Sequence, residues 1–168
     1  MIDVTTYVEL ADGALTPVED AAALPDPFYV EGALLLAVDG HRVMDFDLAD
    51  DVLSLWYDLA NLVTGYLARG TATTMLPDQP VELSMHVGDS DDDVRWSITN
   101  VPDPSTTVMN LVELLDALAS GAAHFFGELS RLRPDETDTF NREAARWPAL
   151  AQRGRHWSTP DSPGATDR

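Results

Sequence analysis

The feature that most constrains the fold is a run of apolar side chains over residues 48–67. They recur at intervals of three and four residues, which is the pattern of an amphipathic helix with one face toward a core. Asp45 or Asp47 is expected to cap the start of this helix, and the pair Arg69-Gly70 is typical of its end. The pattern predicts a long helix near the middle of the chain.

Two hairpins flank this helix in the sequence. Residues 28–38 are apolar and lead into Asp39-Gly40, a dipeptide typical of a type I′ turn, after which residues 41–44 return. Because both flanks are apolar, we expect this hairpin at the centre of a sheet. Residues 81–87 and 94–99 alternate between apolar and polar side chains, which predicts a second hairpin with one buried face.

Shorter strands are expected over residues 2–10 and 106–109, and two more helices close the chain. Asn110 is expected to cap the first of these helices, which ends at Arg133-Pro134. Inside it, Gly121 and Gly127 each lower the helix propensity by about 1 kcal/mol, which indicates a close neighbouring backbone. The last helix, over residues 135–152, is weaker, and Pro148 should break or kink it.

These elements predict an α+β protein. The expected architecture is one twisted antiparallel sheet of about five to six strands, with the two long amphipathic helices on one face. Residues 1–152 form a single domain, and residues 153–168, rich in Gly, Pro, Ser, Thr and Asp, form a flexible C-terminal tail.

The charge of the chain is strongly negative, with a formal net charge of −19. Residues 1–130 hold 23 acidic residues and three arginines, whereas residues 131–168 hold six acidic residues and seven arginines. Binding of nucleic acid or of anionic lipid is therefore disfavoured, because both require basic side chains. The charge favours a basic protein partner, although solubility, genome composition or salt adaptation would also account for it.

The chain contains neither lysine nor cysteine. These absences exclude Schiff-base chemistry, thiol nucleophiles and lysine-dependent phosphate loops within this chain, and no cofactor is expected. The N-terminus shows no signal-peptide pattern, and no apolar run is long enough for a membrane span, so a cytoplasmic location is expected. The sequence does not indicate an oligomeric state.

Two sets of residues are candidates for chemistry. If the protein is an enzyme, His41, Asp45 and His86 are the acid/base candidates, since His41 lies close to carboxylates in the sequence. The acidic loop residues Asp89, Asp91, Asp92 and Asp93 offer oxygen ligands for Ca²⁺ or Mg²⁺, but they lack the glycine and distal glutamate of an EF-hand loop. A solvated hairpin tip explains them equally well, and no metal site is assigned.

Several segments resemble small acidic actinobacterial α+β proteins of uncharacterised function. These segments are residues 29–33 before Asp39-Gly40, Leu55-Trp56, residues 77–80, and Phe125-Phe126, within residues 28–134. The resemblance implies a shared fold and transfers no catalytic residue. Several small acidic proteins of this kind look like the immunity partners of secreted toxins, in general character and not in any shared motif.

The sequence therefore favours a non-enzymatic interaction protein, of the immunity or accessory kind, that binds a basic protein partner. Its expected contacts are Glu82 together with Asp89, Asp91, Asp92 and Asp93, joined by carboxylates of the helices. The alternative is a small enzyme or ligand-binding protein of specialised metabolism, with a pocket between sheet and helices.

Overall fold

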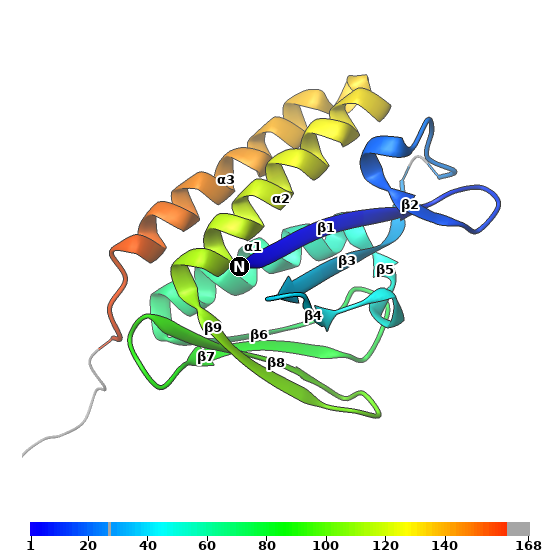
Figure 1. Cartoon of the computed structure of the whole chain (residues 1–168). Coiled ribbons are helices and arrows are strands. Elements are labelled where there is room, and N and C mark those ends of the chain that lie inside the picture. Colours follow the sequence, from blue (N-terminus) through cyan, green and yellow to red (C-terminus); the bar gives the residue numbers. More distant parts are fainter. Residues whose placement is uncertain (27, 161–168) are drawn as a thin grey trace, which may run out of the picture.

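The computed structural model describes residues 1–26 and 28–160 and confirms the α+β class. Antiparallel strands and three long helices build the molecule (Figure 1). The strands do not join into one sheet as expected but divide between two, which we call sheet A and sheet B.

Sheet A comes from the first third of the chain. The order of its main strands is β2-β1-β3-β4, so β3 is central and β4 lies at an edge, where a central hairpin had been expected. A short strand, β5, pairs with the start of β3. The strands are β1 (Ile2–Glu9), β2 (Leu15–Pro17), β3 (Glu31–Val38), β4 (His41–Met44) and β5 (Asp50–Asp51).

Sheet B is a meander in which each strand pairs with its neighbour in the sequence. The strands are β6 (Thr71–Met75), β7 (Glu82–Val87), β8 (Asp93–Thr99) and β9 (Ser105–Asn110). Three of these strands were expected. The fourth, β6, was not, because its sequence TATTM carries no clear apolar alternation.

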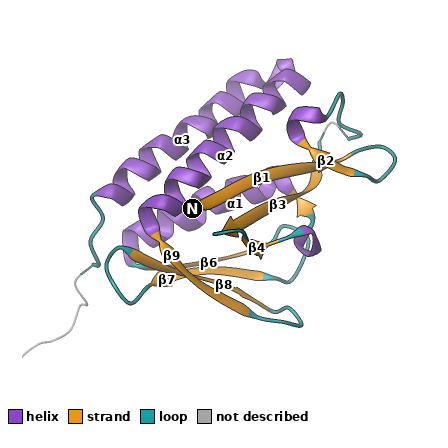
Figure 2. Ribbon diagram, in the orientation of Figure 1, coloured by secondary structure: helices purple, strands orange, loops and turns teal. Residues whose placement is uncertain are grey.

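Three helices pack together beside the sheets (Figure 2). They are α1 (Val52–Arg69), α2 (Leu111–Leu132) and α3 (Thr137–Arg155). Helix α1 contacts both sheets, α2 packs on β1, and α3 packs on α2 and α1. The short 3-10 helices η1 (Val18–Asp20), η2 (Phe46–Leu48) and η3 (Pro134–Glu136) lie in the connections.

The start of α1 differs from the expectation. The carboxylate of Asp51 is the cap and accepts from the backbone N–H groups of Leu53 and Ser54, at 3.2 and 3.3 Å. Asp45 instead caps η2 by accepting from the N–H of Phe46 at 2.8 Å. The helix starts at residue 52 because the preceding residues form η2 and then pair with β3 as β5. Asn110 caps α2 as predicted.

Pro148 was expected to break or kink the last helix, and helix α3 continues through it without a break. The buried residues Trp147 and Leu150 hold both sides of the proline against the rest of the core. The helix reaches Arg155, and the Trp157 ring then stacks on Tyr66 with ring centroids 5.1 Å apart. The predicted tail therefore packs on the body at its beginning, and its residues 161–168 lie outside the described part of the chain.

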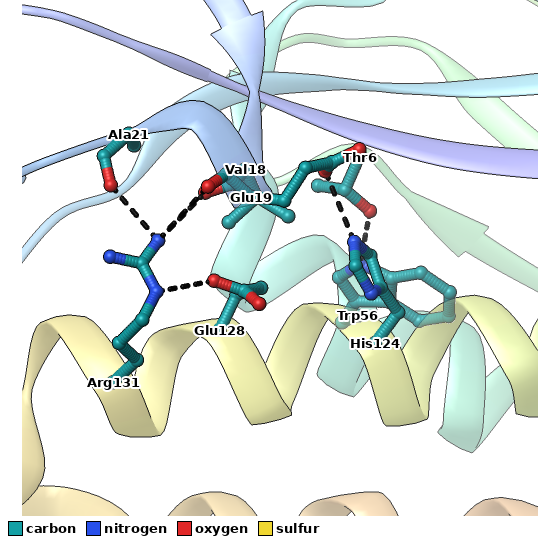
Figure 3. Close-up of polar contacts among 8 residues, drawn as sticks. All are labelled: Thr6, Val18, Glu19, Ala21, Trp56, His124, Glu128 and Arg131. Atoms are coloured by element: carbon teal, nitrogen blue, oxygen red, sulfur yellow. Dashed lines mark hydrogen bonds and ion pairs between the residues drawn. The ribbon is translucent and has the colours of Figure 1, made fainter.

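The core is centred on Trp56 of α1, which is fully buried. Its indole N–H donates to Thr6 Oγ1 of β1 at 3.2 Å, a contact drawn in Figure 3. The same ring stacks on Phe125 of α2 at 6.1 Å and meets Trp147 of α3 edge-on at 5.4 Å. One side chain therefore joins sheet A to all three helices.

The two glycines of α2 lie in different surroundings. A Cβ atom on Gly121 would approach Cγ1 of Val4 to 2.8 Å and the Trp56 ring to 3.3 Å, whereas a Cβ atom on Gly127 would meet nothing within 4 Å. A close neighbour therefore explains Gly121, as predicted, although the contact is with side chains and not with backbone. It does not explain Gly127.

We expect alanine at these two positions to change stability with opposite signs. Gly121→Ala should lower the free energy of unfolding by about 1–3 kcal/mol through overpacking against β1. Gly127→Ala should raise it by about 0.5–1 kcal/mol, because alanine restricts the unfolded chain and favours the helix. Urea unfolding followed by circular dichroism measures both, and equal effects of the two variants would contradict the assignment.

Candidate functional site

The three predicted acid/base residues do not come together in the structure. His41 begins β4 in sheet A, whereas His86 lies on β7 in sheet B, where its Nδ1 is 3.0 Å from Thr71 Oγ1. Asp45 forms an ion pair with Arg42, with two N–O distances of 2.8 and 2.9 Å. This guanidinium and the N–H of Phe46 hold the pKa of Asp45 below its usual value. Within the described residues, no hydrogen bond or ion pair joins any two of these three side chains, and a catalytic role for them stays a prediction.

The acidic loop between β7 and β8 is largely satisfied by its own surroundings. Asp89 pairs with Arg95, Asp91 accepts from Thr159 Oγ1, and Asp93 accepts from Ser90 Oγ at 2.8 Å. Over the described residues, no group of three or more His, Cys, Asp or Glu side chains is placed to hold a metal ion. Two of these bonds lie within the hairpin and the third joins the loop to the segment after α3, and the role of the loop in binding a partner stays a prediction.

Glu82 was expected beside this loop, and the structure places it elsewhere. It is the first residue of β7, whereas the loop follows Val87 at the other end of the strand. At about 3.3 Å per residue, these ends lie roughly 17 Å apart. Glu82 therefore lies at the opposite end of β7 from the loop aspartates, and its role in binding a partner stays a prediction.

A group of hydrogen bonds lies at the junction where the two sheets meet. The carboxylate of Asp50 accepts from the backbone N–H of Asp78, at 3.0 and 3.2 Å, and from that of Asp51 at 2.7 Å. The side-chain amide of Gln79 donates to the carbonyl oxygen of Ala49 at 2.5 Å. These bonds tie the loop at residues 76–81 to the start of α1 and account for the burial of Asp50.

Carboxylates gather on one side of this junction. Tyr29 Oη donates to Asp78 Oδ2 at 2.5 Å, and this bond, with partial burial and the charges of Asp78, Asp50 and Glu31, raises the pKa of Tyr29 well above its usual value. Partial burial and the charges of Asp51 and Asp50 raise the pKa of Asp58 above 3.8. All the charges that act on these two groups are negative.

A groove of about 580 Å³ also borders the junction, where Leu48, Gln79 and Val81 line it. Its apolar lining includes three side chains that are at least nine-tenths buried, and its polar lining holds three aspartates and two amides. The apolar residues are Val43, Leu48, Val81, Ile98, Val101, Pro80 and Pro102; the polar ones are Asp45, Asp47, Asp103, Gln79, Asn100 and Ser105. We call this hollow the inter-sheet groove.

The carboxylates of Glu31, Asp47, Asp58, Asp78 and Asp103 surround this junction, and we call them the junction surface. None of the five belongs to an ion pair within residues 1–26 and 28–160. Local sequence patterns did not indicate that Asp50 would hold the loop at residues 76–81, because Asp50 and Asp78 are 28 positions apart.

An imidazole–carboxylate pair occurs elsewhere, in a hollow of about 360 Å³ between β1 and α2. His124 Nε2 lies 3.0 Å from Glu19 Oε2, and this bond lowers the pKa of Glu19 (Figure 3). Nearby, Arg131 donates to the carbonyl oxygens of Val18, Glu19 and Ala21. These bonds hold η1 against α2. Within the described chain, no other side chain hydrogen-bonds to the His124 ring. The pair of His124 and Glu19 therefore has a structural explanation.

Comparison with models of known protein families, with curated proteins and with solved structures gave no match. The resemblance to small acidic actinobacterial proteins therefore stays an expectation. No helix in the described part of the chain combines the length and the apolar character needed to cross a membrane.

The raised pKa of Asp58 predicts a stability change that depends on pH. A carboxyl group whose pKa is higher in the folded state than in the unfolded state lowers stability once it ionises. Asp58→Asn should therefore raise the melting temperature at pH 7, and the gain should shrink as pH falls through the folded pKa and vanish below 3.8. Thermal unfolding of both proteins at several pH values measures this, and a gain that persists at low pH would contradict it.

Proposed function

We propose that this chain is a non-enzymatic interaction protein, of the immunity or accessory kind, that binds a basic protein partner through the junction surface. The observation that carries the proposal is the distribution of ion pairs. In the part of the chain that the structure describes, six arginines pair with carboxylates, and none of these carboxylates belongs to the junction surface; the arginines are Arg42, Arg95, Arg131, Arg133, Arg146 and Arg155.

The raised pKa values of Tyr29 and Asp58 also support a basic partner at this surface. Carboxylates that raise the pKa of Asp58 and Tyr29 repel one another in the isolated chain. A cationic surface would relieve this repulsion, and the surrounding negative field would increase the rate of association more than the affinity. Aromatic rings are present at the same place, since Phe28 exposes 91% of its surface next to Tyr29. Exposed aromatic side chains beside charges are typical of interface anchors.

Affinity capture with charge-matched variants tests the proposal. The junction variant carries Glu31→Gln, Asp58→Asn and Asp78→Asn. The control variant carries Glu113→Gln, Asp3→Asn and Asp20→Asn, which remove the same charge from exposed positions away from the junction. Each protein is immobilised and exposed to a lysate of the source organism at low and moderate salt, and the retained proteins are identified and quantified.

The wild type and the control variant should retain one basic protein in near-stoichiometric amount, and the junction variant should retain it at least about tenfold less, a difference of about 1.4 kcal/mol. Higher salt should weaken retention by screening the charges. Retention of no basic protein under either condition, or equal loss from both variants, would overturn the proposal. Equal loss would mean that total charge, and not this surface, is responsible.

A further inference from the structure

The inter-sheet groove is lined by both apolar and negatively charged side chains. Leu48, Val81 and Ile98 give it an apolar floor, and the carboxylates of Asp47 and Asp103 stand among its polar residues. No arginine or histidine is among the residues that line it. A ligand that fits this lining has an apolar body and a positively charged end.

The three aspartates that line the groove differ in their ion pairing. Asp45 is already neutralised by Arg42. Within the described chain, no hydrogen bond or ion pair reaches the carboxylates of Asp47 and Asp103. Two negative groups and the amide oxygens of Gln79 and Asn100 therefore remain as acceptors around an apolar floor.

From this lining we infer that the groove binds an arginine side chain presented by the basic partner. The three methylene groups of arginine would cover the apolar floor, and the guanidinium would donate to Asp47, Asp103 and the amide oxygens. This inference rests on the proposed function and adds to it the position and the chemistry of the anchor.

Arginine fits this lining better than lysine does. The planar guanidinium has five N–H donors in a fixed geometry, so it can serve several acceptors spread around a groove, and it is more weakly hydrated than an ammonium group. The lysine ammonium is a compact charge that would reach fewer of these acceptors at once. A purely apolar side chain would leave both aspartates without a cation.

The test uses three small probes on the whole protein: the Nα-acetyl amides of arginine, lysine and citrulline. Citrulline has nearly the shape of arginine but no charge. Each probe is titrated at low salt while the backbone amide resonances are followed by NMR. The groove variant carries Asp47→Asn and Asp103→Asn, and its control carries Asp3→Asn and Asp20→Asn. Binding of a 20-residue oligoarginine peptide is measured on the same proteins.

We expect the arginine probe to shift the amide resonances of Val43, Val81 and Val101 in a saturable way, with a Kd on the order of 1 mM. Binding should be at least about tenfold weaker for the lysine and citrulline probes and for the groove variant, and unchanged for its control. Equal binding of citrulline, or shifts confined to the loop at residues 88–92, would overturn the inference.

The oligoarginine peptide separates this inference from the proposed function. If the peptide binds in a salt-dependent way and the junction variant weakens it, but the arginine probe does not enter the groove, the arginine site is wrong and the junction surface stands. If neither the probe nor the peptide binds, both the site and the proposed function are overturned.

Discussion

Replacing Trp56 with alanine is expected to lower the free energy of unfolding by about 3–5 kcal/mol, the range found for large aromatic side chains removed from a core. The residue is fully buried and is packed on Phe125 and Trp147 from two other helices. Alanine would leave a cavity where sheet A and three helices meet, and the surrounding rings cannot all move into it. Urea unfolding followed by far-UV circular dichroism measures the loss.

Trp56→Phe separates the packing of this residue from its polar contact. Phenylalanine keeps most of the apolar volume but leaves Thr6 Oγ1 without its donor, and we expect a loss of about 1–2 kcal/mol. The double variant Trp56→Phe with Thr6→Val should recover part of that loss, since neither polar partner then remains buried. A small effect of Trp56→Ala, below about 1 kcal/mol, would contradict the central position of this ring.

Gly32→Ala is expected to have the second largest effect on stability. Gly32 lies in β3 opposite Val8 of β1, and a Cβ atom there would overlap the carbonyl oxygen of Tyr7. That oxygen belongs to the backbone of the paired strand, so it cannot turn away as a side chain can. We expect a loss of about 2–3 kcal/mol through displacement of β1 from β3.

The matched comparison for this variant is Gly127→Ala, which adds the same methyl group where no atom lies within 4 Å. Equilibrium unfolding in urea gives the difference between the two variants directly. Amide hydrogen exchange should also show faster exchange along β1 in Gly32→Ala and not in Gly127→Ala. Similar stability of the two variants would show that β1 adjusts without cost.

Local patterns in the sequence predicted the elements with strong periodicity. The body of α1, the β7–β8 hairpin and the Asn110 cap of α2 all follow from side-chain spacing that acts over a few residues. The start of α1 was misplaced by four or six residues, because several aspartates could serve as its cap and pairing with β3 decided among them. Strand β6 was missed because only its pairing with β7 identifies it as a strand.

The division into two sheets and the candidate site depend on contacts that the sequence does not display. Asp50 and Asp78 are 28 positions apart, and Tyr29 and Asp78 are 49 apart. The composition showed the acidity from which we predicted a basic partner. It did not show where in the fold the acidic residues would gather. The loop aspartates form a run in the sequence, and local bonds account for Asp89 and Asp93, whereas the junction carboxylates are scattered along the chain.

The bond between Asp50 and the backbone of Asp78 also bears on the order in which the molecule assembles. Sheet B can close through short loops, since its strands follow one another along the chain, while β1 must find β3 across a longer intervening segment. The hydrogen bonds between the Asp50 carboxylate and the backbone N–H of Asp78 can form only when the start of α1 and the loop between β6 and β7 are both in place. Their formation therefore reports that the start of α1 and the loop at residues 76–81 have docked on each other.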